Sequence, residues 1–321
     1  MAAGDQVQPP LHTTAGATPG ILPVAEGDAP EYEVALKSLS QWQLAARRFR
    51  RHKLALIGVA VFGSMLVIAI FAPIVAPFDS LNYPGAIKPG GDAPSLTHLF
   101  GTDRDGRDVF GMVINGARIS MSVGIFSTLI AGFTGVLLGS IAGYVGGLVD
   151  NVLMRIVDVL FAIPFLFVIL VAARFFGQGQ VSSIILIFGL LSWPLIARLV
   201  RASFLSLREA DFVDAARAVG VSPARITFRH ILPNALGPVI VAMTLLTSSN
   251  IVLEAFVSFL NFGIKETDVS WGNALANAQN ALSLGNWWWA FFPGMSIALT
   301  VISINFIGDG LHDALDPRTR E

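Results

Sequence analysis

The chain has 321 residues, of which 54% are hydrophobic and only 13% are charged. About a quarter of the residues of an average soluble domain are charged, so this deficit predicts repeated membrane spans, where charged side chains are costly. A net charge of −1 gives no reason to expect a nucleic-acid partner, and the absence of cysteine excludes disulfides and thiolate metal sites.

The N-terminal region divides into two parts. Residues 1–30 are rich in Ala, Gly, Pro and Thr without periodicity, which predicts a disordered tail. Residues 31–53 carry apolar side chains at loosely helical spacing and end in a basic cluster from Arg47 to Lys53. A calmodulin-like target is the formal alternative. Because the cluster directly precedes an apolar run, we favour an amphipathic juxtamembrane helix on the cytoplasmic surface.

Six apolar segments are long enough to cross a bilayer as helices, which predicts an all-α polytopic membrane protein. They cover residues 54–76, 117–143, 151–174, 181–205, 234–262 and 289–310. The first span and its loop occupy 54–116, a five-helix core 117–311, and a short tail 312–321. Small residues in the second span predict close helix packing, at Gly124, Gly132, Gly135, Gly139 and Gly143.

The distribution of basic residues predicts the orientation in the membrane. With the N-terminus in the cytoplasm, all but six of the 21 Lys and Arg residues fall on the cytoplasmic side; the six are Lys88, Arg104, Arg107, Arg118, Arg174 and Lys265. This bias follows the positive-inside rule. It places both termini and residues 206–233 in the cytoplasm, and residues 77–116 and 263–288 outside.

Residues 211–233 form a polar insert between two spans, and we call this segment the elbow. Gly220 follows an alanine-rich helical stretch and suits a left-handed helix end. Ser222 offers a capping hydroxyl, and Pro223 fits the first position of a second helix, which we expect to stop before Pro233. Composition alone would also fit a solvated interfacial loop.

The order of residues in the elbow favours a docking role. Asp214-Ala215-Ala216, then Gly220, then Leu232-Pro233 resemble the Glu-Ala-Ala coupling motif of binding-protein-dependent ABC importer permeases. Asp214 keeps the charge of the family's Glu but has a shorter reach. The resemblance implies that coupling helices at 209–232 dock on a cytoplasmic ATPase, through Asp214, Ala215, Ala216, Gly220, Pro223 and Arg225.

A second motif, residues 98–108, directly precedes the second span. The aspartates in this stretch could bind a hard cation such as calcium, but we favour local turns and ion pairs of these aspartates with Arg104 and Arg107. The Asp and Gly residues of this stretch also suggest the signature of membrane phosphatidyltransferases. That enzyme class needs further aspartates at helical spacing in the next helix, and residues 117–143 contain none, so we exclude it. The segment is similar to the Gly-Thr-Asp-x-x-Gly-Arg-Asp motif of the second permease subunit of dipeptide, oligopeptide and nickel importers, at Gly101, Thr102, Asp103, Gly106, Arg107 and Asp108. The resemblance extends over roughly residues 45–318.

Several polar or aromatic side chains lie in or beside the spans. Arg155 and Asp158 are one helical turn apart, which predicts a mutual ion pair. Glu254 lies in an otherwise apolar or small-residue stretch, so it should face either a polar partner on another helix or a water-filled path. We assign Glu254 to the substrate pathway. The Trp287–Trp289 triplet predicts an aromatic belt, or alternatively a mouth for a delivering protein.

The sequence contains no phosphate-binding loop, no HExxH and no Ser or Cys/His catalytic motif, so we expect no enzyme activity, no cofactor and no metal. The resemblance implies a type I ABC importer permease in the bacterial cytoplasmic membrane. Its partners would be a second homologous permease subunit, two cytoplasmic ATPases and an extracytoplasmic substrate-binding protein. Short peptides are the expected cargo, with nickel, opines or oligosaccharides as alternatives. A self-sufficient secondary transporter or channel would require inverted repeats, which we do not find.

Overall fold

The structure is a computed structural model, and it describes residues 41–76, 91–177, 179–265, 268–279, 281 and 284–316. The predicted tail, the first part of the 31–53 segment and residues 77–90 lie outside the described residues. In the described part, regular structure is helical apart from one isolated bridge between Thr102 and Asp108. The all-α prediction is therefore confirmed.

The described helices follow one another as short and long elements. In chain order they are α1 Gln41–Phe49, α2 Lys53–Ile70, α3 Ala72–Val75, α4 Val109–Val145, α5 Gly147–Ala162, α6 Phe165–Ala172, the π-helical η2 Ala173–Gly177, α7 Val181–Leu207, α8 Asp211–Ala218, α9 Pro223–Arg225, the π-helical η3 Ile226–Ile231, α10 Leu232–Phe259, α11 Trp271–Asn277 and α12 Trp288–Leu315.

Five of the described helices are long and apolar enough to cross a membrane, or six if the bent pair α5–α6 counts as one span. The predicted third span, continuous over 151–174, is wrong in this respect, because the chain bends by 86° between α5 and α6. Pro164 disfavours a helical conformation in the residue before it. Ile163 accordingly has extended angles, with φ −88° and ψ 135°.

Two other helices extend beyond their predicted limits. Helix α4 begins at Val109 rather than at 117, because the Asp108 carboxylate caps it by accepting a hydrogen bond from the Phe110 amide at 3.1 Å. Its 37 residues span about 55 Å at 1.5 Å per residue, more than a hydrocarbon core of ~30 Å. Helix α12 continues to Leu315, into the segment predicted as a tail.

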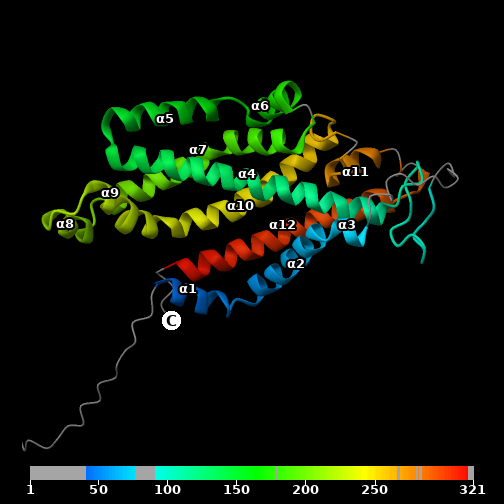
Figure 1. Cartoon of the computed structure of the whole chain (residues 1–321), viewed down its shortest axis with the longest axis horizontal. Coiled ribbons are helices and arrows are strands. Elements are labelled where there is room, and N and C mark those ends of the chain that lie inside the picture. The colour runs from blue at the N-terminus through cyan, green and yellow to red at the C-terminus, as the bar shows by residue number, and fades with distance from the viewer. Residues whose placement is uncertain are drawn as a thin grey trace, which may run out of the picture. The chain divides into compact units, whose positions relative to one another are not determined.

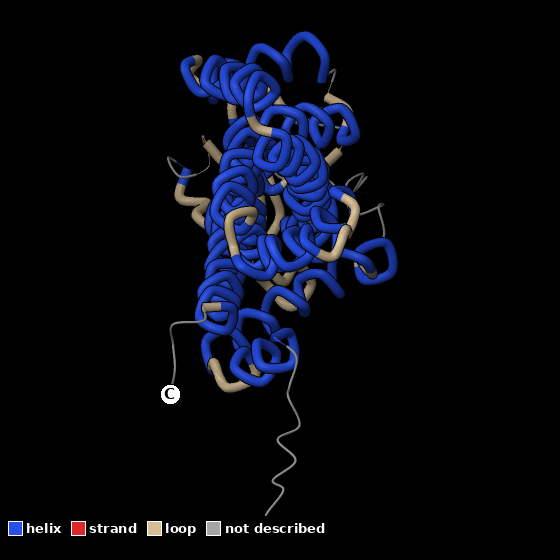
Figure 2. Tube along the Cα trace, turned by 90° about the vertical axis from the view of Figure 1, so that its left-hand side faces the viewer, coloured by secondary structure: helices blue, strands red, loops and turns tan. Residues whose placement is uncertain are grey.

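The long helices alternate in direction, so the connections between them collect at two ends of the bundle (Figure 1). We call these the elbow end, which carries α8, α9 and the end of α12, and the loop end, which carries residues 91–108 and α11. Helix α1 packs against the end of α12, where Arg48 donates a hydrogen bond to the Asp316 carbonyl at 3.0 Å. Figure 2 shows the bundle turned by 90° from this view.

Helix α4 lies at the centre of the packing, and its glycines allow the close approach that the sequence predicts. A Cβ atom on Gly139 would lie 2.5 Å from the Ala197 carbonyl oxygen, and one on Gly143 would lie 2.5 Å from the Phe204 Cβ. Both neighbours belong to α7. Gly124 and Gly132 lie against α10 in the same way. The α4 backbone therefore touches two other spans.

Ion pairs join α5 to α7. The predicted pair between Arg155 and Asp158 is wrong, because Asp158 instead accepts a hydrogen bond from Arg198 of α7 at 2.8 Å. Nearer the elbow end, both Nε and Nη2 of Arg201 bind the Asp150 carboxylate. A pair within one helix contributes only about 0.2–0.5 kcal/mol, so a guanidinium on a packed neighbour readily replaces it.

Candidate functional site

The elbow begins with α8, and Gly220 closes that helix as predicted. Gly220 has φ +76°, in the left-handed region. Its amide donates to the Arg217 carbonyl at 3.0 Å, and the Val221 amide donates to the Ala216 carbonyl at 3.1 Å. These two bonds form a Schellman motif, which satisfies the last carbonyls of the helix. The joint between the arms of the elbow is therefore an ordered turn.

The second arm differs from the prediction in two ways. Pro223 does start α9, but the Ser222 side chain makes no capping hydrogen bond. The expected stop before Pro233 is wrong, because η3 continues directly into α10 and residues 223–259 form one helix of 37 residues.

The π-helical turn η3 explains why Pro233 does not end the helix. The Leu232 amide bonds to the Thr227 carbonyl, five residues back. The Asn234 side chain donates to the His230 carbonyl at 2.7 Å. Pro233 has no amide donor of its own, but the Thr227 and His230 carbonyls in the preceding turn still receive hydrogen bonds. One comes from an amide five residues ahead and the other from a side chain. The second arm of the elbow and the α10 span therefore form one continuous helix.

Most of the predicted coupling residues lie on the surface of the elbow. The exposed ones are Asp214, Ala215, Gly220, Pro223 and Arg225. Ala216 is instead buried with Val213 and Ile226, in an apolar cluster that joins the elbow to α4, α7 and α10. The Asp214 carboxylate pairs with Arg217 at 2.9 Å.

Sequence reasoning missed three apolar side chains that the elbow exposes. Phe212, Val219 and Phe228 are 41%, 79% and 64% exposed. The signal that could have identified them is their position in a polar segment outside the predicted spans. Exposed apolar side chains in such a segment are typical of a docking surface.

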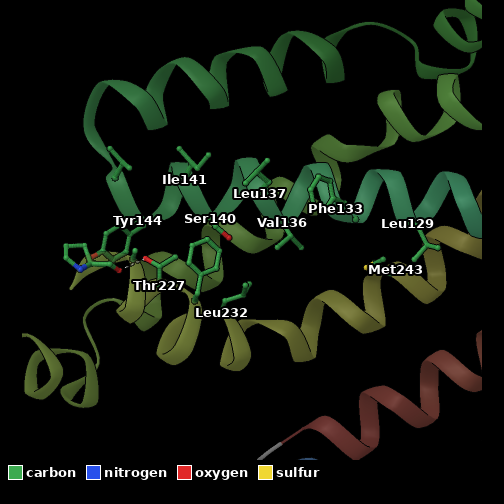
Figure 3. A pocket seen from close by; sticks show the side chains of 15 residues that line it. Leu129, Phe133, Val136, Leu137, Ser140, Ile141, Tyr144, Thr227, Leu232 and Met243 are labelled. Atoms are coloured by element: carbon green, nitrogen blue, oxygen red, sulfur yellow. Dashed lines mark hydrogen bonds between the residues drawn. The ribbon is translucent and has the colours of Figure 1, made fainter. Parts of the chain in front are cut away.

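A groove of about 610 Å³ lies at the root of the elbow, between α4 and the η3–α10 stretch (Figure 3). Val136, Leu232 and Met243 project into the space between these helices. The Ser140 hydroxyl is buried there with no hydrogen-bond partner among the described residues. Because nearly all of its lining is apolar, this groove offers little to a polar cargo.

At the loop end, the Gly101–Asp108 motif forms a tight turn around Asp103. The Asp103 carboxylate accepts hydrogen bonds from the backbone amides of Asp105 and Arg107 at 2.9 and 2.8 Å, and from Arg107 Nε at 2.8 Å. Arg107 also binds Asp105 at 2.9 Å. Burial raises the pKa of Asp103, and the charge of Arg107 opposes this shift without cancelling it. The favoured ion pairing is thus observed for Arg107.

The same motif holds the start of α12. The Thr102 carbonyl accepts hydrogen bonds from the indole nitrogens of Trp288 and Trp289 at 3.2 and 2.6 Å. These two tryptophans are only 7% and 5% exposed, so the predicted belt is wrong for them, while Trp287 is 50% exposed. Since buried indoles require an acceptor, the motif and α12 stabilise each other.

Glu254 is fully buried inside the bundle. Its carboxylate accepts hydrogen bonds from Ser120 of α4 at 2.6 Å and from Ser258 of α10 at 2.8 Å. The Ser270 hydroxyl interacts with the same carboxylate. Of the two alternatives that the sequence left open, a polar partner on another helix or a water-filled path, the structure shows the first. A contact between Glu254 and a substrate stays a prediction.

The hydroxyls around Glu254 also accept hydrogen bonds from the chain that leads into α11. Ser258, Ser120 and Ser270 receive the backbone amides of Ile264, Trp271 and Asn273, at 3.3, 3.2 and 3.2 Å. One carboxylate thus orders three hydroxyls, and these hold the backbone at Ile264, Trp271 and Asn273 in place beside α4 and α10.

Comparisons with known proteins match nearly the whole chain. Residues 135–321 match the family described as binding-protein-dependent transport system inner membrane component, and residues 40–88 match the N-terminal transmembrane domain of oligopeptide transport permease C.

Curated relatives extend the match. The oligopeptide transport system permease protein OppC of Bacillus subtilis (strain 168) is 38% identical over 301 residues, covering 93% of this chain and 97% of the relative. OppC of Escherichia coli (strain K12) is 40% identical over 298 residues, covering 92% and 96%. The dipeptide transport system permease protein DppC of B. subtilis is 38% identical over 283 residues, covering 88% of each chain.

These matches agree with a helical bundle that has five or six membrane-spanning elements. They extend over both of its ends, including the elbow and the Gly101–Asp108 motif. The chain therefore belongs to the family of inner-membrane permease subunits of binding-protein-dependent ABC transport systems.

Proposed function

We propose that the chain forms half of the translocation pathway of an ATP-driven importer for short peptides. The names of its relatives, oligopeptide and dipeptide transport permeases, support this cargo. A second homologous permease subunit would form the other half, and an extracytoplasmic binding protein would deliver the peptide. Two cytoplasmic ATPase subunits would hydrolyse ATP, since the chain has no phosphate-binding loop of its own.

The elbow is the observation that carries this proposal. Its first arm joins α7 through only Arg208, Glu209 and Ala210, and its second arm is continuous with α10. Arg208 also donates a hydrogen bond to the Gly143 carbonyl at the end of α4, at 3.3 Å. A force applied to the elbow would therefore reach α10 directly, and α4 through α7.

The coupling residues would act by fitting a groove on an ATPase. Ala215 presents a small side chain that permits close approach, whereas the exposed Asp214 and Arg225 supply charge. Closure of the ATPases on ATP would pull the elbow and favour the outward-open state of the bundle. Hydrolysis would restore the inward-open state, as two-state switching by differential binding requires.

The proposed orientation places the elbow end, and with it both termini, in the cytoplasm. The supporting pattern is the concentration of Arg and Lys at that end, including Arg47, Arg48, Lys53, Arg217 and Arg229.

The experiment that tests coupling is Gly220→Val in the assembled transporter. A valine at φ +76° would cost about 1–2 kcal/mol in backbone strain. This cost favours a different backbone conformation at the turn, and with it a different angle between the two arms. We expect loss of peptide-stimulated ATP turnover, with membrane insertion retained. Gly285→Val is the matched control, because Gly285 also has positive φ and open space but lies at the loop end.

Full peptide-linked ATP turnover in Gly220→Val would contradict the coupling role. Equal loss in both variants would attribute the defect to general strain. Purification of the tagged chain should bring down two ATPases and a second permease. The ligand held by the co-purified binding protein would then identify the cargo.

A further inference from the structure

We propose that a second groove, between α6, α10 and α12, is this chain's share of the peptide path. Its binding residues would be Ser248, Ser249 and Asn305, which would hydrogen-bond the backbone of the cargo. The groove has a volume of about 560 Å³ and is open on one side. This inference rests on the proposed import function and assigns it a place inside the bundle.

The three polar side chains line the same groove, two from α10 and one from α12. The Ser248 hydroxyl shares its proton between the Leu245 carbonyl at 2.9 Å and Asn305 Oδ1 at 3.1 Å, and the second contact links α10 to α12. The Asn305 Nδ2 amide group has no hydrogen-bond partner among the described residues, and Asn305 borders the groove. Ser249 is exposed on the groove wall, and its hydroxyl donates to the Leu245 carbonyl at 3.0 Å. The Ser249 oxygen therefore keeps lone pairs available as acceptors.

A peptide that crosses the apolar interior must keep its amides and carbonyls hydrogen-bonded. Each unpaired polar group costs roughly 2–7 kcal/mol in an apolar environment. A free amide donor and hydroxyl acceptors at one depth match the alternating donors and acceptors of an extended backbone.

The groove lining also bears on nickel as an alternative cargo. Among the described residues that line the groove, none is charged and none is histidine. Nickel prefers imidazole and similar ligands, so this lining does not suit a bare nickel ion. It does suit a neutral backbone whose side chains vary in charge and size.

The remaining polar side chains of α10 do not compete for this role. Asn250 is buried toward α4, where its amide nitrogen donates to Ser127 and Thr128 at 3.0 and 3.1 Å. Glu254 is equally enclosed, as described above. Helix α10 therefore directs one polar face into the packing and another into the groove. The larger groove at the elbow root has an apolar lining and would leave backbone groups unpaired.

The absence of native cysteine allows a direct test by thiol labelling. Ser249→Cys is introduced into the full chain and assembled with its partners in proteoliposomes. A small charged methanethiosulfonate reagent is then added, and peptide uptake is measured before and after labelling. Val67→Cys, an exposed apolar position on α2 outside the groove, is the matched control.

We expect Ser249→Cys to react several-fold faster than Val67→Cys, and peptide-loaded binding protein with ATP to slow the reaction. Labelling should reduce uptake severely. The inference is overturned if Ser249→Cys does not react, if labelling leaves uptake unchanged, or if the thiol crosslinks to a helix of the second permease that fills the groove. If the unmodified transporter shows no ATP-dependent peptide uptake, the proposed function itself fails. Normal uptake with an unreactive Ser249→Cys refutes the groove assignment alone.

Discussion

At the residue scale, the surroundings of Glu254 illustrate how one buried carboxylate can organise a neighbourhood. Both carboxylate oxygens of Glu254 accept a hydrogen bond, one from Ser120 and one from Ser258, so these two hydroxyls point their hydrogens toward it. Their oxygens then remain free to accept the amides of Trp271 and Ile264. The carboxylate thus determines indirectly where the backbone before α11 is held.

Glu254→Gln tests this arrangement. The new amide group requires an acceptor, so one serine must reverse its hydroxyl and release a backbone amide, at a cost of about 1–3 kcal/mol. We expect faster hydrogen exchange at the amides of residues 264–273, and a greater loss of uptake than of assembly. Asp313→Asn removes an exposed carboxylate outside the elbow and is the control. Unchanged exchange in Glu254→Gln would show that the hydroxyls order themselves without the carboxylate.

Residue patterns were informative where the cause was local. Gly220 is identifiable because only glycine readily adopts a left-handed turn after a helix, and its φ of +76° agrees. The partner of Asp158 was not identifiable, because Arg198 lies on another helix and reaches it only after α5 packs on α7.

At the scale of elements, the seam between α4 and α7 depends on the absence of side chains. Gly135, Gly139 and Gly143 share one face of α4, and each would place a Cβ within 2.9 Å of an α7 atom. Gly63 of α2 is different, because nothing lies within 4 Å of the position of its Cβ. The two kinds of helical glycine should respond oppositely to the same substitution.

Gly139→Ala should destabilise the purified chain by about 1–3 kcal/mol, since an added methyl group meets the Ala197 carbonyl in a close-packed seam. Gly63→Ala should be neutral or stabilise by about 0.5–1 kcal/mol, because alanine favours the helix and finds open space. Thermal unfolding of both variants in detergent measures the difference. Equal shifts in Tm would mean that the seam can open to accept a methyl group.

The ends of the helices depend on local hydrogen bonds, which the spacing of apolar residues in the sequence does not reveal. Pro164 does break its span, whereas Pro233 is accommodated by a π-helical turn and by the Asn234 side chain. The same residue type therefore ends one helix and not the other, because the carbonyls around it are satisfied differently.

At the scale of the whole molecule, the alternation of the long helices separates two ends. Val219, directly after α8, lies at the elbow end and is 79% exposed, and Leu96 lies at the loop end and is 98% exposed. Because the bundle crosses a membrane, these two positions face opposite compartments, and the concentration of basic residues predicts that the elbow end is cytoplasmic.

Single-cysteine variants test this orientation. In sealed right-side-out vesicles, a membrane-impermeant thiol reagent should label Leu96→Cys and not Val219→Cys. After the vesicles are permeabilised with detergent, both should react, which controls for intrinsic reactivity. Labelling of Val219→Cys alone in sealed vesicles would invert the proposed topology and remove the elbow from the reach of a cytoplasmic ATPase.

The amino-acid sequence by itself determined the helical membrane class, the spans to within a few residues at most ends, and the turn at Gly220. It could do so because hydrophobic length, helix propensity and the backbone freedom of glycine act over short stretches of chain. It also carried the motifs by which the family is identified.

Only the tertiary structure decided which polar side chains hold the bundle together and which line open space. Glu254 and Ser249 lie five residues apart on α10, yet one is enclosed by hydroxyls from α4 and α10 and the other faces a groove. Their difference arises from which helices pack on each side of α10. That packing joins residues more than a hundred positions apart, a separation over which no local pattern extends.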